Sequence, residues 1–107
     1  MQLMTKEIEK KLPKIKSTGN SEPSDIDVVV KFFTPWTNWT WYAIEGEKME
    51  NGDWIFYGLV EGLETELGQW RLSDLQSITG PLGLKIERDK GFTGKLSALL
   101  QYYVHGR

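Results

Sequence analysis

The chain has 107 residues, a formal net charge of −2, a hydrophobic content of 39% and a charged content of 26%. This length and composition predict one soluble globular domain over residues 1–107, and no apolar run is long enough to cross a bilayer. The absence of cysteine excludes disulfides, thiolate catalysis and thiolate metal sites. An overall acidic charge argues against a generic nucleic-acid-binding module, because such modules are usually basic.

The first third of the chain predicts a helix, a loop and a strand. Thr5 can cap a short helix over residues 6–12, which a proline stops. Residues 16–25 are small and polar, and they include glycine and proline, so we expect a loop. Residues 26–33 are rich in β-branched and aromatic side chains and predict a strand, which Pro35 ends.

The middle of the chain carries the clearest local signal. Asn51-Gly52 lies between the apolar segments 38–49 and 54–60, a pattern that favours a two-residue hairpin turn with Met49 opposite Trp54. The same register places Ala43 opposite Val60. One face of this hairpin would carry Trp39, Trp41, Ala43, Met49, Trp54, Phe56 and Val60, and the other Tyr42, Ile44, Ile55, Tyr57 and Leu59.

Both faces of the predicted hairpin are therefore apolar. A half-solvated antiparallel sheet alternates apolar and polar residues, so this hairpin should lie inside the sheet and be covered on both sides, or one side must be a contact surface. Three short helices supply enough residues to cover one face. We expect the second face to lack a cover unless the helices divide between the two faces.

The last third of the chain predicts two further strands and two helices. Residues 68–72 and 84–88 are the strand candidates, and charges within 84–88 indicate an edge position. Residues 73–76 form a capping box that opens a helix ended by Gly80, and a C-terminal helix is expected over residues 93–104. The element order predicts an α+β domain with a mainly antiparallel sheet of four to five strands and three short helices.

No segment of the sequence predicts a catalytic or metal site. His105 is the only histidine and lies close to the C-terminus, where a fixed geometry for catalysis is not expected. Zinc would have only carboxylate ligands, with no suitable spacing, and no phosphate-binding or dinucleotide motif is present. We therefore expect a protein that is not an enzyme and binds no metal and no cofactor.

Aromatic residues are concentrated in residues 32–42, which hold three of the five tryptophans. Trp39 and Trp41 fit the periodicity of a strand and are expected to pack in a core or at a contact surface. Trp36 lies between Pro35 and Thr37 in a loop, with no periodic reason to point inward. It is therefore a candidate anchor for a partner protein.

Several segments, in one order along the chain, match a known pattern: residues 3–7, 11–13, 28–35, 38–42, 56–60, 64–68, 73–75 and 80–89. Through them, residues 3–92 resemble a family of small proteins of unknown function carried by bacterial plasmids, conjugative elements and phages. Trp36 departs from the small or acidic residue that this resemblance implies. The resemblance implies no catalytic residue, but it implies a context, because accessory proteins of mobile elements often inhibit CRISPR nucleases or restriction enzymes.

Three hypotheses follow for the function. The first is a non-enzymatic mobile-element protein in the cytoplasm of a bacterial host that binds a protein, plausibly a host defence nuclease complex. The second is a nucleic-acid-binding accessory protein that uses its basic N-terminal segment, and the third is a homodimer of unknown role. The first would use Trp36, Asn38, Trp39, Trp41, Glu45 and Glu47, and the second Lys6, Lys10, Lys11, Lys14 and Lys16.

Overall fold

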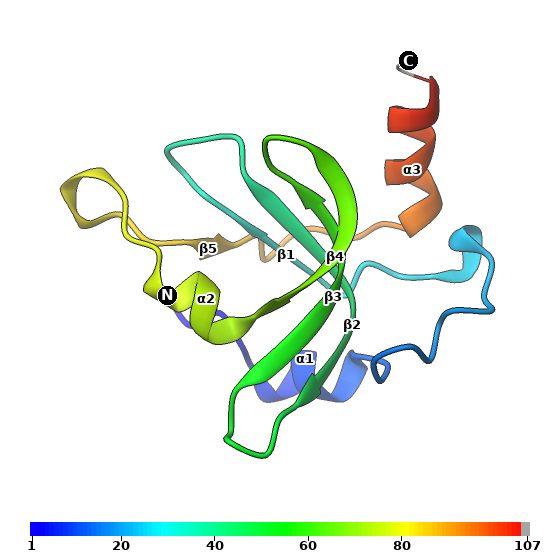
Figure 1. Ribbon diagram of the computed structural model, residues 1–107, viewed down its shortest axis with the longest axis horizontal. Coiled ribbons are helices and arrows are strands. Elements are labelled where there is room, and N and C mark those ends of the chain that lie inside the picture. The colour runs from blue at the N-terminus through cyan, green and yellow to red at the C-terminus, as the bar shows by residue number, and fades with distance from the viewer. Residues whose placement is uncertain (106–107) are drawn as a thin grey trace.

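The chain folds around one five-stranded antiparallel sheet with helices on both sides (Figure 1). The computed structural model describes the backbone of residues 1–105 and the side chains of residues 1–100. The strand order β4-β3-β2-β1-β5 makes the first four strands a meander, and β5 returns to pair with β1. The predicted α+β class and element order are confirmed. The elements are α1 (Lys6–Lys11), β1 (Val30–Phe33), β2 (Thr40–Lys48), β3 (Trp54–Glu61), β4 (Thr65–Arg71), α2 (Leu72–Ser77), β5 (Glu87–Arg88) and α3 (Leu96–His105), with 3-10 turns at Pro23–Asp25 and Pro81–Gly83.

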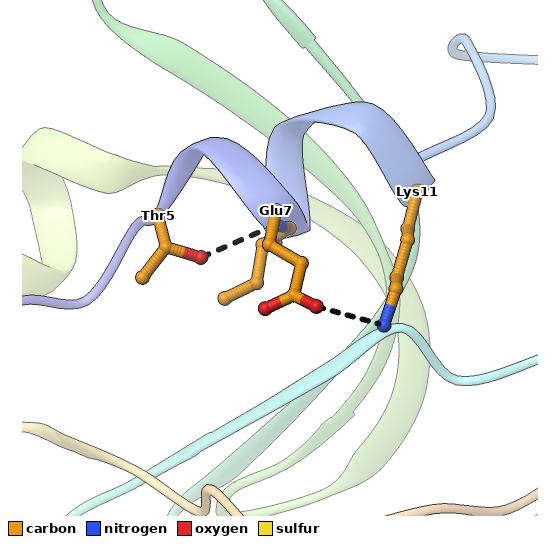
Figure 2. Close-up of polar contacts among 4 residues, drawn as sticks. Thr5, Glu7 and Lys11 are labelled. Atoms are coloured by element: carbon orange, nitrogen blue, oxygen red, sulfur yellow. Dashed lines mark hydrogen bonds and ion pairs between the residues drawn. The ribbon is translucent and has the colours of Figure 1, made fainter.

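Helix α1 begins where the sequence predicts it, because Thr5 satisfies one of the free amides at the helix start. The Thr5 hydroxyl accepts a hydrogen bond from the Ile8 N–H at 3.2 Å (Figure 2). Glu7 and Lys11 form an exposed ion pair, with 3.9 Å between carboxylate and ammonium (Figure 2). Ile8 is buried with Leu12, so the apolar side of this short helix anchors the N-terminus to the sheet.

Both faces of the sheet carry an apolar core, with α1 and α2 on one face and the start of α3 on the other (Figure 1). On one face, α1 and α2 pack over Phe56, whose ring centroid lies 5.5 Å from that of Phe32 and 5.6 Å from that of Trp70. On the other, Leu96 of α3 packs together with residues from segment 26–28. The second face is thus covered only in part, because Leu67 of β4 is 44% exposed on the α3 side. The α1–α2 core comprises Leu3, Met4, Ile8, Leu12, Val30, Phe32, Trp41, Ala43, Trp54, Phe56, Trp70, Leu75 and Ile86, and the α3 core Ile26, Val28, Tyr42, Ile44, Leu59 and Leu96.

The hairpin between β2 and β3 turns next to the predicted position, with Glu50 and Asn51 as the central residues of the turn and Gly52 after them, so the loop is longer than the predicted two residues. The Gly52 N–H donates to the Met49 carbonyl at 3.0 Å, and the Met49 N–H donates to the Asp53 carbonyl at 2.7 Å. Gly52 has a φ of +89°, which suits glycine. Trp54 pairs with Lys48, so the predicted pairing with Met49 is wrong by one residue.

Strand β2 also contains a β-bulge, which the sequence pattern does not predict. Ala43 pairs with Gly58 and Glu45 pairs with Tyr57, which leaves Ile44 without a partner on β3. Because the extra residue shifts the alternation of side chains by one, Ile44 and Glu45 both lie on the α3 side of the sheet. Together, the one-residue shift at the turn and the bulge displace the predicted partner of Ala43 by two residues, from Val60 to Gly58.

Helix α2 starts at Leu72, and the predicted capping role of Ser73 is wrong. The Asp74 carboxylate instead accepts a hydrogen bond from the Arg71 N–H at 3.0 Å. The Ser73 hydroxyl donates to the Asp53 carboxylate at 2.6 Å, and the Ser73 N–H donates to it at 3.1 Å. These bonds tie the start of α2 to the β2–β3 hairpin.

Four predicted elements have clearly different starts: β1, β5 and α3 begin three or four residues later than expected, and β4 begins three residues earlier. Strand β1 starts at Val30, and of the preceding residues Asp27 forms an isolated bridge with Lys95. The Lys95 ammonium lies 2.6 Å from the Asp27 carboxylate, and Leu96 begins α3 directly afterwards. Residues 93–95 are therefore outside the helix predicted over 93–104.

Within residues 1–105, no helix is both long and apolar enough to cross a membrane.

Candidate functional site

The loop between β1 and β2, residues 34–39, contains three of the predicted contact residues. Hydrogen bonds within it hold its shape: the Thr34 N–H donates to the Trp39 carbonyl at 3.0 Å, and the Trp39 N–H donates to the Thr37 hydroxyl at 3.2 Å. The Thr34 and Thr37 hydroxyls are also hydrogen-bonded to each other. Asn38 is exposed in this loop. The loop is thus a fixed support for its two tryptophans.

Trp36 has a packing role that its sequence context does not reveal. Its side chain is half-buried and packs against the α1–α2 core. The ring lies directly over Gly80, where an added Cβ would be 2.3 Å from Trp36 Cε2. Trp36 thus packs on its neighbour and exposes only part of its ring, since the missing side chain of Gly80 makes room for it.

Trp39 is the more exposed tryptophan of this loop. Its side chain is 38% exposed, whereas Trp41 behind it is buried. The two rings lie 5.8 Å apart between centroids, with an interplanar angle of 31°. Trp39 also covers Gly62, where an added Cβ would lie 2.3 Å from the indole ring. Trp41 supports Trp39 from behind and cannot itself be a surface contact.

Two leucines extend the apolar surface beyond the tryptophans. Leu63, next to Gly62 in the β3–β4 turn, is 95% exposed, and Leu82, two residues after Gly80, is fully exposed. Leu82 also adopts a left-handed backbone conformation, with φ 58° and ψ 23°, which costs a non-glycine residue roughly 1 kcal/mol. The turn around Leu82 is closed by the Leu84 N–H, which donates to the Pro81 carbonyl at 3.1 Å, so the backbone holds this side chain out in solvent.

These four side chains define a surface that we call the apolar rim: Trp36, Trp39, Leu63 and Leu82. It spans three loops, because each tryptophan packs on a glycine of a neighbouring loop. The β1–β2 and β3–β4 loops lie side by side at one end of the sheet, opposite the β2–β3 hairpin (Figure 1). Neither leucine was predicted as a contact residue from the sequence, although a leucine inside a glycine-containing turn indicates an exposed apolar side chain.

Acidic side chains flank the rim on its β3–β4 side. Glu61 and Glu64 lie on either side of Gly62-Leu63, and exposed Glu66 follows on β4. No basic residue lies in the segment between Glu61 and Glu66. This side of the rim therefore has a negative potential, which favours a basic surface on any partner.

The two glutamates predicted to steer a partner have another role. Glu45 is buried, and its carboxylate accepts hydrogen bonds from the Lys16 N–H at 2.6 Å, the Thr18 N–H at 2.9 Å and the Thr18 hydroxyl. Exposed Glu47 accepts a hydrogen bond from the Ile15 N–H at 3.0 Å. Both carboxylates thus bind the loop that follows α1. The prediction that Glu45 and Glu47 share a surface with the tryptophans is wrong, because the bulge directs Glu45 towards this loop.

The lysines of the nucleic-acid alternative are all exposed, but acids interrupt them. Helix α1 lies towards the β2–β3 hairpin end of the sheet (Figure 1), and Glu7 and Glu9 alternate with its lysines. Lys11 is paired with Glu7 (Figure 2). The positive charge of this segment is therefore partly neutralised, and it lies away from the rim. The exposed lysines are Lys6, Lys10, Lys11, Lys14 and Lys16.

Tyr42, on the α3 side of the sheet, has a strongly perturbed ionisation. Burial, and then the neighbouring Glu61 carboxylate, raise the pKa of Tyr42 well above its ordinary value of 10.0. The Lys31 ammonium lies 5.6 Å from the Tyr42 ring centroid and 5.2 Å from that of Phe92, and 3.7 Å from the Asp89 carboxylate. Tyr42 is thus held as a neutral phenol at physiological pH, which does not suit a general base.

No group of three or more histidine, cysteine, aspartate or glutamate side chains able to hold a metal occurs within the part of the chain that the structure describes. The side chain of His105 lies outside the described residues.

Fold and site together define a small α+β domain in which Leu63 and Leu82, the two most exposed large apolar side chains of residues 1–100, lie on loops next to the glycines that Trp39 and Trp36 cover. The family model described as "Protein of unknown function (DUF2958)" matches residues 3–105, so the chain belongs to this family. No curated protein matches the chain, and no solved structure matches it.

Proposed function

We propose that the protein acts by binding another protein through the apolar rim, without catalysing a reaction. The observation that carries the proposal is the presentation of Leu82, which is fully exposed on a left-handed backbone that glycine would adopt at lower cost. Leu63 and Trp39 support it, because exposed leucines beside a tryptophan on a fixed support are suited to filling pockets on a partner.

The expected energy of such a contact is considerable for so few residues. Complete burial of a leucine side chain contributes about 1.5–3 kcal/mol, and truncation of an interface tryptophan often costs about 2 kcal/mol or more. Because the β1–β2 loop is fixed by its own hydrogen bonds, its backbone loses little conformational entropy when the rim binds a partner. The rim residues are therefore expected to dominate the affinity.

We propose further that the protein is an accessory protein of bacterial mobile elements and inhibits a host defence nuclease complex in the cytoplasm. The support for this role is the sequence resemblance to plasmid- and phage-borne proteins, together with the charge next to the rim. Glu61, Glu64 and Glu66 favour a basic partner, and nucleases that bind nucleic acid present basic channels.

The first test locates the contact surface. A photo-crosslinking amino acid replaces Leu63, Leu82 or, as a control at the other end of the sheet, the exposed Glu50, in cells that carry a defence system. We expect one protein to be captured from both leucine positions and not from Glu50. Equal capture from all three positions would contradict the assignment of the rim.

The second test concerns the biological role. Cells with a restriction or CRISPR system are transformed with targeted and untargeted plasmids, with and without the protein. We expect wild type to raise the yield of targeted plasmid, and Leu82→Asn to lose this effect while the free energy of unfolding is kept, because asparagine tolerates the left-handed conformation. Unchanged yields across a panel of defence systems would remove the anti-defence role and leave the binding proposal to the crosslinking test.

The nucleic-acid alternative predicts a different result. If the N-terminal lysines bind a phosphate backbone, the protein is retained on immobilised DNA at low salt and released as the salt concentration rises. Absence of retention at low salt would exclude this alternative.

A further inference from the structure

Strand β4 forms one edge of the sheet and leaves one side of its backbone open. It has seven residues, and its ladder to β3 runs without interruption from Thr65 to Arg71. Within residues 1–105, the backbone of this strand has one hydrogen-bond partner beyond β3, the Asp74 carboxylate, which accepts from the Arg71 N–H. The outward N–H and C=O groups of residues 65–70 are thus available to another strand.

The two edges of the sheet are protected very differently. Strand β5, at the other edge, has only two residues. Natural proteins limit edge pairing with short strands, lysines, prolines or bulges. Strand β4 is long, contains neither lysine nor proline, and shows no register shift in its ladder. It has the features of an edge that pairs.

Gly68, at the centre of β4, has no packing reason to be glycine. A Cβ added there would meet nothing within 4 Å, and its φ is not in the left-handed region. Its partner Gly58 differs, because a Cβ at Gly58 would lie 1.8 Å from the Tyr42 carbonyl oxygen. Glycine inside a strand weakens it, and often marks a place where another backbone approaches closely. The missing Cβ leaves the face of the sheet open at Gly68, since side chains stand perpendicular to a sheet.

We infer that β4 of a second copy of this chain pairs with this edge in the antiparallel direction, around a two-fold axis at Gly68. The charges favour this direction: Glu64 and Glu66 lie at one end of the edge and Arg71 at the other. A two-fold axis places the Arg71 end of each copy beside the acidic end of the other, whereas parallel pairing would align like charges.

Leu67 gives this pairing an apolar contribution. Its side chain is 44% exposed and lines a groove of about 420 Å³ together with Tyr57, Gln69 and Ile44 on the α3 side of the sheet. Pairing around Gly68 sets Leu67 opposite Gln69 of the second copy. Leu67 of the second copy then lies diagonally across the axis from Leu67 of the first. A paired edge alone is smaller than the roughly 1,200 Å² of a standard interface, so we expect a weak, concentration-dependent dimer.

The first experiment measures mass in solution as a function of protein concentration by sedimentation. We expect wild type to shift from monomer towards dimer as the concentration rises. Leu67→Lys should remain monomeric, because two lysines would lie near the axis, whereas Leu84→Lys, at a leucine that is 40% exposed off the β4 edge, should behave like wild type. A monomeric wild type at all concentrations, or equal effects of the two substitutions, would overturn the inference.

A second experiment tests the axis itself. The sequence has no cysteine, so Gly68→Cys introduces a single thiol, and its Cβ fits the monomer without a clash. Residues directly opposite on antiparallel strands have Cα atoms about 4.5–5.5 Å apart, a separation that a disulfide spans. With oxidised glutathione as oxidant, we expect Gly68→Cys to form covalent dimers at least tenfold faster than the exposed hairpin variant Asn51→Cys. Equal rates for the two variants would overturn the pairing at Gly68.

Discussion

Replacement of Glu45 by alanine tests the connection between the β2 bulge and the loop after α1. The wild-type carboxylate is buried and accepts three hydrogen bonds from Lys16 and Thr18. Hydrogen bonds to a charged group contribute about 1.5–3 kcal/mol each, but the freed amides of this partly exposed loop regain bonds to water. We therefore expect Glu45→Ala to lower the free energy of unfolding by about 2–4 kcal/mol.

Glu47→Ala is the matched control. Glu47 is exposed and accepts one hydrogen bond, from Ile15, so its removal should cost no more than about 1 kcal/mol. Urea denaturation gives both values, and amide hydrogen exchange reports the loop directly. Protection should fall at Lys16 and Thr18 in Glu45→Ala alone. A loss below about 0.5 kcal/mol with unchanged protection would show that Glu45 does not hold the loop.

Three further predictions concern the rim and the hairpin. Gly80→Ala places a methyl group 2.3 Å from Trp36 Cε2, so the indole must move, and we expect a loss of about 1–3 kcal/mol with altered tryptophan fluorescence; an unchanged Tm would contradict the contact. Leu82→Gly relieves the left-handed strain and should leave the protein as stable or up to about 1 kcal/mol more stable, while partner capture is lost; a marked loss of stability would show that Leu82 packs. The hydrogen bond from the Ser73 hydroxyl holds the pKa of Asp53 below its ordinary value of 3.8, so Asp53 stabilises the fold above that pH and this contribution disappears as the pH falls through the lowered pKa. Asp53→Asn should thus be less stable than wild type at pH 7, with a difference that shrinks below about pH 4 in thermal unfolding; a constant difference would refute this linkage.

The architecture could be predicted because its signals are local. Thr5 caps α1, Asn51-Gly52 marks the hairpin turn, and the alternation of apolar residues assigns Trp41 and Tyr42 to opposite faces. The detailed register could not, because the bulge at Ile44 directs the neighbouring Glu45 carboxylate towards Lys16 and Thr18, which lie 27–29 residues earlier in the chain. No local pattern records such a contact.

The site was predictable only in part, for a related reason. Asn38 and Trp39 are exposed in the loop that the tryptophan-rich segment indicates. The packing of Trp36 could not be predicted, because the glycine that accommodates its ring lies in a different loop, after α2. Trp41 was assigned correctly to a strand, but the sequence does not say that a second tryptophan covers it.

The contacts between tryptophans and glycines in the rim have a consequence for quality control in the cell. The surface is composed of three chain segments that meet only when β1 to β4 are paired and the loop before β5 has returned to Trp36. A nascent chain, or a fragment cut in any of these loops, carries the same leucines without their common support. Under the proposed function, such a chain would bind a partner more weakly than the intact protein, so the rim would distinguish finished molecules from incomplete ones.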